Sequence, residues 1–185
     1  MDKGKENYLR FLNGDKEGLT DIVRDYKDGL IFYINSFVSN IHTAEELAED
    51  TFVYLFTHRP RDKGGASFKT WLYTIGRNKA IDYIRKNRKR QEITEEEYGR
   101  LADDERDLES SCIKTEEKLA VHKAMEKLKA EYRQILWLIY FEGFSHKEAA
   151  MVMKKTANNI DVLVSRARAA LKAELEKEGF SYEGL

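Results

Sequence analysis

Apolar residues recur every three or four positions along much of the chain, starting with residues 44–56. The residues with this spacing are Ala44, Leu47, Ala48, Phe52, Leu55 and Phe56. Such spacing places them on one face of a helix. Thr43 precedes this run and Glu46 follows three residues later, which predicts a capping box at the helix start. Pro60 and the Gly64–Gly65 pair then predict a loop.

A second helix is predicted to follow this loop, with Ser67 as its N-cap. Its apolar positions are again three and four apart: Phe68, Trp71, Leu72 and Ile75. We expect Phe68, Leu72 and Ile75 to face the core. If the helix continues to Arg90, it spans about 36 Å, because an α-helix rises about 1.5 Å per residue.

The C-terminal part of the chain predicts four shorter helical stretches. Helix faces are indicated by Val121, Ala124, Met125 and Leu128, by Tyr132, Ile135, Leu136 and Ile139, and finally by Ile160, Leu163, Val164, Ala167 and Leu171. Between the last two, a Ser145–Glu148 capping box predicts a short helix, Lys154–Lys155 a turn and Thr156 an N-cap. A short helix, a turn and a longer helix form the helix-turn-helix layout. Since strand-like alternation is nowhere sustained, the fold class is predicted as all-α.

Charge is distributed very unevenly along the 185 residues. The net charge is -1, from 32 basic and 33 acidic residues. Residues 61–90 carry +8, residues 91–117 carry -8, residues 145–177 carry +3 and residues 1–60 carry -4. An acidic stretch with few apolar residues is typical of a flexible linker. We therefore predict two small helical domains, residues 1–91 and 118–185, joined by an acidic flexible linker at residues 92–117. A solvated helix face is the alternative for that stretch.

Composition excludes several protein classes. Cys112 is the only cysteine, so a disulfide framework within the chain is excluded. No apolar run is long enough to span a membrane and no signal-peptide core is present, which indicates a cytoplasmic protein. The four histidines have no metal-ligand spacing, and no phosphate-binding glycine loop or nucleophile motif is present. We expect no catalysis, no cofactor and no metal site.

The outer face of the last predicted helix has the composition of a duplex DNA-binding surface. Arginine and lysine suit phosphates, asparagine suits an adenine edge, and a small apolar side chain suits a thymine methyl group. Thr156, at the helix start, offers free backbone N–H groups to a phosphate. The alternative is an ordinary helical bundle whose polar face meets water. The remaining residues of this face are Asn158, Asn159, Asp161, Val162, Ser165, Arg166, Arg168 and Lys172.

The segment Phe68–Arg90 interleaves aromatic and basic residues, which favours binding of single-stranded nucleic acid. Five of the six residues in Arg85–Arg90 are basic and repel one another unless an anion binds there. The alternative is that the aromatic residues are core and the basic ones surface. In the helix after Thr43, Glu45, Glu46, Glu49 and Asp50 lie opposite the apolar face. This acidic face indicates a basic protein partner, with simple solvation as the alternative.

These segments together resemble the extracytoplasmic-function (ECF) sigma factors of bacterial RNA polymerase. The stretches AEELAEDTFVYLF (residues 44–56) and FKTWLYTIGRNKAIDYIRKNRKR (residues 68–90) are similar to region 2 of that family. Residues 132–172 resemble region 4. The pattern F-x-x-W-L-x-x-I-x-x-N-x-x-x-D-x-x-R is specific, and the order and spacing of the segments agree. The resemblance implies a non-enzymatic transcription-initiation subunit that binds core RNA polymerase, recognises the −35 and −10 promoter elements and promotes DNA melting.

The resemblance also implies roles for particular residues. Polymerase docking would fall to Glu46, Glu49, Asp50 and Phe52. The −10 element would be bound, with a base flipped from the stack, by the loop from Thr57 to Ala66 and by Lys69, Trp71, Arg77, Asn78, Asp82 and Arg85. The −35 element would be bound by Thr156, Asn158, Asn159, Asp161, Val162, Ser165, Arg166 and Arg168.

The chain departs from the family pattern at three of these positions. The family usually has glutamine at the position of Glu49, and many members have a basic residue and a serine at the positions of Asp161 and Val162. The −35 preference of other members therefore does not transfer to this chain. Partners implied by the resemblance are core RNA polymerase, promoter DNA as duplex and as melted strand, and an anti-sigma factor. The alternative function is a stand-alone helix-turn-helix transcription regulator, which leaves Phe68–Arg90 and the acidic face unexplained.

Overall fold

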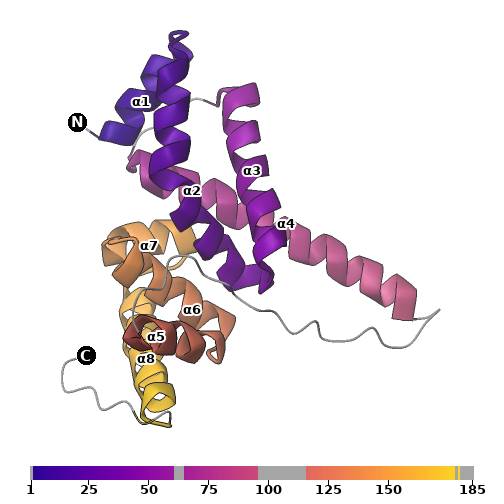
Figure 1. The fold of residues 1–185 in the computed structure, drawn as a ribbon, viewed down its shortest axis with the longest axis vertical. Coiled ribbons are helices and arrows are strands. Elements are labelled where there is room, and N and C mark those ends of the chain that lie inside the picture. Colours follow the sequence, from indigo (N-terminus) through magenta and orange to yellow (C-terminus); the bar gives the residue numbers. More distant parts are fainter. Residues whose placement is uncertain (1, 61–64, 96–115, 178, 180–185) are drawn as a thin grey trace. The chain divides into compact units, whose positions relative to one another are not determined.

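The computed structural model describes residues 2–60, 65–95, 116–177 and 179, and every regular element among them is helical. The chain divides into two compact units. The first contains α1 (Lys3–Leu12), α2 (Lys16–Val38), α3 (Ile41–His58) and α4 (Phe68–Glu95) (Figure 1). The second contains α5 (Glu116–Glu126), α6 (Ala130–Leu136), a π-helical turn η1 (Trp137–Phe141), most of α7 (His146–Met153) and α8 (Ala157–Lys177). The all-α prediction is confirmed.

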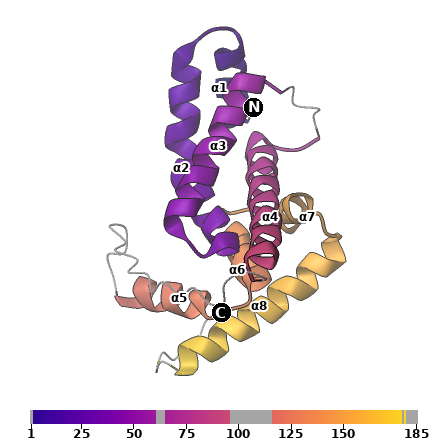
Figure 2. The same ribbon diagram turned by 90° about the vertical axis from the view of Figure 1, so that its right-hand side faces the viewer.

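In the first unit, α2 and α3 lie side by side, and α4 packs against both of them (Figures 1 and 2). The core is fully buried and comes from all three helices, with Leu30 and Ile34 from α2, Ala48 and Leu55 from α3, and Leu72 from α4. Helix α4 can approach α2 closely because position 76 is glycine. A Cβ atom there would lie 2.8 Å from Cδ1 of Leu30, too close unless the Leu30 side chain or the helix shifts.

Helices α1 and α2 were not predicted from the sequence, and the start of α1 is joined to the start of α4. One carboxylate oxygen of Asp2 accepts a hydrogen bond from the backbone N–H of Gly4, 3.0 Å away. The other oxygen accepts from the backbone N–H of Phe68, the first residue of α4. Asp2 therefore caps two helices whose starts are far apart in the sequence.

Two details of the predicted helices in the first unit are wrong. Helix α3 begins at Ile41, and its N-cap is Asn40, whose side chain accepts from the N–H of Thr43 at 3.0 Å. The predicted Thr43–Glu46 capping box is therefore not the helix start. Ile75 is only half-buried, because the buried face of α4 passes through Leu72, Tyr73 and Ala80 instead.

The second unit is built around α8, which packs against α5 and α6. All five predicted core residues of α8 are buried, and Leu175 extends the same face. Arg133 connects α6 to the end of α5, since its guanidinium donates to the carbonyls of Glu126 at 3.0 Å and Leu128 at 2.9 Å. Burial lowers the pKa of Arg133.

The boundaries of the predicted linker remain a prediction. Helix α4 ends at Glu95, so the first residues assigned to the linker, from Glu92 onward, are helical. Helix α5 begins at Glu116. The stretch between, residues 96–115 with Cys112, lies outside the described residues.

Candidate nucleic-acid interface

Helix α3 exposes an acidic ridge, which we define as Glu45, Glu46, Glu49 and Asp50. All four side chains are exposed, and only Glu45 has an ion-pair partner within the described residues, His42 at 3.6 Å. Three carboxylates of the ridge are therefore available to a basic surface. Val53, one turn beyond Glu49 and 56% exposed, adds an apolar contact to this face.

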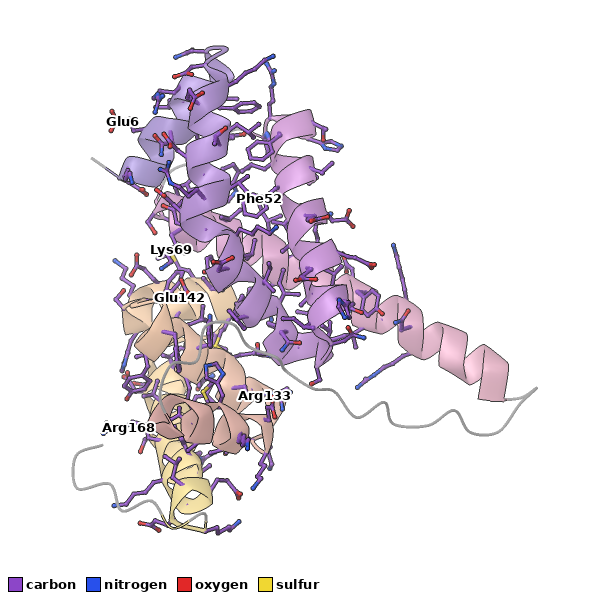
Figure 3. All side chains as sticks on the ribbon, in the orientation of Figure 1. Glu6, Phe52, Lys69, Arg133, Glu142 and Arg168 are labelled. Atoms are coloured by element: carbon purple, nitrogen blue, oxygen red, sulfur yellow. The ribbon has the colours of Figure 1, made fainter. Side chains whose placement is uncertain are left out.

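Phe52 does not share the surface of the acidic ridge. Its side chain is only 5% exposed, and its ring stacks on that of Phe56 with 6.1 Å between centroids. Phe52 thus belongs to the core of the first unit, as its place on the ribbon shows (Figure 3). We correct the expected direct docking contact to a supporting one, in which Phe52 fixes the helix that presents the carboxylates. Val53 was the exposed residue that the sequence pattern missed.

Helix α4 places four of its six predicted DNA-binding residues in one row. Trp71, Asn78, Asp82 and Arg85 are separated by seven, four and three positions, and residues of an α-helix repeat every 3.6 positions. The row points away from the buried residues Leu72, Tyr73 and Ala80 of α4. Asp82 and Arg85 are exposed within it, with 3.8 Å between the carboxylate and the guanidinium.

Lys69 and Arg77 lie outside this row. The Lys69 ammonium is 5.7 Å from the centre of the Tyr73 ring. Arg77 is half-buried, and its charge acts on the hydroxyl of buried Tyr33, whose pKa is raised by burial and lowered to a smaller extent by Arg77. Lys69, two residues before Trp71, therefore lies on the opposite side of α4 from the row, and Arg77 lies about a third of a turn from it.

Trp71 is half-buried because it belongs to an aromatic cluster between α1 and α4. Its ring meets those of Tyr8 at 5.4 Å and Phe68 at 5.8 Å, both edge-to-face. The Tyr8 hydroxyl donates to the carbonyl of Pro60 at 2.9 Å, and burial raises the pKa of Tyr8 to about 12. The same tyrosine thus contacts the tryptophan and the start of the predicted DNA-binding loop, of which residues 61–64 lie outside the described residues.

Two N-caps and a left-handed residue define the helix-turn-helix segment. Ser145 and Glu148 form the predicted capping box: the Ser145 N–H donates to Oε2 of Glu148 at 3.0 Å, and the Glu148 N–H donates to Oγ of Ser145 at 3.3 Å. Lys154 has φ of 54° and ends α7. Oγ1 of Thr156 then accepts from the N–H of Asn159 at 3.3 Å. The predicted turn and both caps are confirmed.

All eight residues predicted to bind the −35 element are exposed. Around α8 they form a central row with basic residues on either side. Asn158, Val162 and Ser165 make the central row, and Val162 is 49% exposed. Arg166 and Arg168 lie on opposite sides of it, because two residues apart on a helix means a rotation of about 200°. Arg168 extends away from the helix axis (Figure 3).

Metal-binding clusters and membrane-spanning helices are both absent from the described residues. No group of three or more His, Cys, Asp or Glu side chains among them could bind a metal ion. Within the same residues, no helix combines the length and the apolar content needed to cross a bilayer.

Comparison with known proteins matches both units. The model of Sigma-70 region 2 matches residues 22–90, and that of Sigma-70, region 4 matches residues 118–171. The ECF RNA polymerase sigma factor SigM of Bacillus subtilis is 29% identical over 155 residues, which is 84% of this chain and 93% of SigM. The RNA polymerase sigma-H factor of Pseudomonas aeruginosa is 27% identical over 175 residues, 90% of this chain and 91% of its own.

Solved structures show the same fold. The sigma factor RpoE from Bartonella quintana has a TM-score of 0.69 at 25% identity, covering 87% of this chain and 98% of its own. CnrH has a TM-score of 0.66 at 22% identity, covering 95% of this chain and 99% of its own. Helix α1 lies before both matched ranges, which begin at residues 22 and 118.

Proposed function

The chain belongs to the ECF sigma factors of bacterial RNA polymerase, and its role is in transcription initiation; on that premise we propose the finer steps. The chain binds core RNA polymerase, recognises the −35 and −10 elements of promoters and promotes melting of the DNA. It works in the cytoplasm, where the polymerase acts. The polymerase supplies the chemistry of RNA synthesis.

The proposal that the chain binds duplex DNA rests on the two distinct sides of α8. Its apolar side is buried in the unit, and its opposite side exposes a row of small polar and apolar residues between two arginines. This composition suits the major groove, where a recognition helix contacts base edges with phosphates on both sides. Asn158 and Val162 are placed to contact bases, and Arg166 and Arg168 to contact phosphates.

Strand capture is proposed for α4. The row of Trp71, Asn78, Asp82 and Arg85 offers an aromatic ring, hydrogen-bonding groups and a cation to the unpaired bases and backbone of one strand. Bases freed from the duplex stack on aromatic rings, and cations follow the phosphates. Because Tyr8 contacts both Trp71 and Pro60, it links the aromatic ring to the backbone at Pro60.

Docking on the polymerase is proposed for the acidic ridge of α3. Glu46, Glu49 and Asp50 are exposed and have no ion-pair partner within the described residues. A basic surface therefore gains three charge pairs without first breaking any internal one. Exposed charges of this kind mainly accelerate and orient association.

The test is assembly with purified bacterial core polymerase. We expect the wild-type chain to co-migrate with the core enzyme on a sizing column, and Glu46→Lys with Asp50→Lys to abolish co-migration. Glu17→Lys with Asp28→Lys is the matched control, because it makes the same charge change at exposed positions of α2. Failure of the wild type to associate at low salt would refute the sigma-factor mechanism and leave a stand-alone helix-turn-helix regulator as the function.

An anti-sigma factor is the further partner we propose. RpoE of Bartonella quintana was solved in complex with the anti-sigma factor NepR, and CnrH with the cytosolic domain of CnrY. We expect a regulator of this chain to cover the acidic ridge or the exposed face of α8 and so prevent holoenzyme formation. A pull-down from the native host tests this, and a captured protein that does not compete with core polymerase would contradict it.

A further inference from the structure

One contact on the DNA-facing side of α8 is not explained by phosphate binding. Nδ1 of His146, the first residue of α7, lies 2.6 Å from Oδ1 of Asp161 on α8. The two side chains are 47% and 58% exposed, so both remain open to a ligand. Because an ionised carboxylate only accepts hydrogen bonds, the imidazole must present its Nδ1–H to Asp161. This fixes the carboxylate and leaves Oδ2 without a partner among the described residues.

The pair lies at the end of a groove along α8. The groove has a volume of about 380 Å³ and is open to solvent. Asp161 is the fifth residue of α8, near the N-terminal end, where a recognition helix contacts base edges. Arg168 and Lys172 follow two and three turns later on the same side. The full lining is His146, Asp161, Val164, Ser165, Arg168, Ala169 and Lys172.

A fixed carboxylate selects strongly among the groups exposed in the major groove. Guanine presents two acceptors there and thymine presents one, and both repel a carboxylate oxygen. Adenine presents an amino donor beside the acceptor N7. Cytosine presents the amino group N4 with no acceptor on the same base. Cytosine is therefore the base whose major-groove edge suits an oxygen such as Oδ2 of Asp161.

The surrounding charges make such a contact compatible with DNA. A carboxylate near phosphates is repelled unless cations are close and a donor is available. Arg168 and Lys172 supply the cations on the same side of α8, and His146 supplies a second hydrogen bond. The arrangement resembles base recognition flanked by phosphate contacts rather than a purely electrostatic surface.

We propose that Asp161 recognises one cytosine of the −35 element through its amino group, and that His146 is the positioning residue that orients the carboxylate. The inference rests on the proposed function, since it assigns the base that this helix selects. It also gives a role to a departure from the family pattern, because many members have a basic residue at this position.

The experiment is a selection from a randomised DNA duplex library by the full chain assembled with core polymerase. After the selection, binding is measured on four duplexes that carry the selected sequence and differ from one another at one base pair. We expect one −35 position at which the wild type prefers cytosine by roughly tenfold. Asp161→Ala abolishes that preference and leaves the other positions unchanged. His146→Leu abolishes most of it.

Two further variants separate positioning from a general structural effect. His146→Asn restores the preference, because Nδ2 of asparagine occupies the same place in the side chain as Nδ1 of histidine. Glu176→Gln, which removes a carboxylate from the C-terminal end of α8, retains it. Thermal unfolding of every variant confirms that the fold is unchanged.

The outcomes distinguish this inference from the proposed function. A holoenzyme that selects no sequence at all contradicts the proposed function. A holoenzyme that selects a −35 element without cytosine preference, or retains the preference with Asp161→Ala, overturns only the role of Asp161. If Asp161→Ala changes the affinity for all four duplexes equally, Asp161 acts by its charge alone, and its proposed role in recognising cytosine is overturned as well. Failure of His146→Asn to restore the preference overturns the positioning role of His146.

Discussion

Helices α4 and α8 are both proposed to contact DNA, yet they relate to their cores in opposite ways. In α8 and at its N-cap Thr156, all eight predicted DNA-binding residues are exposed, and the core residues occupy the other side of the helix. In α4, Trp71 packs on Tyr8 and Phe68, and Arg77 is half-buried near the hydroxyl of Tyr33. A rigid duplex can be recognised by a fully exposed face, whereas an unpaired strand needs an aromatic ring held in place by packing. We therefore expect substitutions at the proposed DNA-binding residues packed in α4 to change both the stability of the fold and DNA binding. Substitutions on the exposed face of α8 should change DNA binding alone.

The largest effect on stability is expected from Trp71→Ala. It removes two edge-to-face ring contacts and part of a buried surface, so the free energy of unfolding should fall by about 2–3 kcal/mol, below the range for a fully buried tryptophan. Trp71→Phe keeps an aromatic ring and should cost less. Urea denaturation measures both. If Trp71→Ala is as stable as the wild type, the packing of Trp71 does not link the stability of the fold to strand capture by α4.

A smaller effect is expected from Ser145→Ala, which tests the framework of the helix-turn-helix segment. The substitution removes the oxygen that accepts from the Glu148 N–H and contacts its carboxylate at 2.7 Å. Loss of such a cap should cost about 1 kcal/mol. The control Ser165→Ala removes an exposed hydroxyl from the outer face of α8. If thermal unfolding gives the same midpoint for both variants, the capping box does not stabilise α7.

Asp82→Asn should change stability by less than about 0.5 kcal/mol, because its pair with Arg85 is long and exposed. It nevertheless lies in the row proposed for strand capture, so open promoter complexes should form less readily. Urea denaturation and an open-complex assay on the same preparation measure the two effects. A marked loss of stability would show instead that the Asp82–Arg85 pair stabilises this part of α4.

Arg166→Ala should also leave the free energy of unfolding within about 0.5 kcal/mol of the wild type, because the side chain is exposed. Affinity for promoter DNA should fall for all sequences alike, and the slope of log affinity against log salt should decrease by about 1. Binding at several salt concentrations measures this. Lys177→Ala, at the C-terminal end of α8 and paired with Glu174 at 2.6 Å, is the control with an unchanged slope.

The sequence predicted best those helices whose apolar residues form one uninterrupted face. In α8 the spacing of Ile160, Leu163, Val164 and Ala167 identified the core side, and the exposed side followed directly. Helix α4 was harder, because aromatic residues occur on more than one side of it. Trp71 therefore appeared to be either core or ligand contact, and the structure shows a half-buried ring.

Other features depend on contacts between distant residues, which spacing does not reveal. Asp2 caps α4 across 66 positions of sequence, and Tyr8 contacts the carbonyl of Pro60. The α3 cap was misplaced because Asn40 and Thr43 are both good caps, and only the observed hydrogen bond distinguishes them. The His146–Asp161 pair was also missed, since the two residues lie on different helices. A pattern confined to one helix carries no information on such pairs.

The most direct test of the division between α4 and α8 is permanganate reactivity of the −10 thymines in promoter complexes. The promoter is taken from the library selection, and each holoenzyme is added at a concentration that saturates the DNA. We expect the holoenzyme with Asn78→Ala and Arg85→Ala to remain bound but to lose the reactivity, whereas the Arg166→Ala holoenzyme regains wild-type reactivity once the DNA is saturated. Loss of reactivity in saturated Arg166→Ala complexes, or normal reactivity in the α4 variant, would contradict this division.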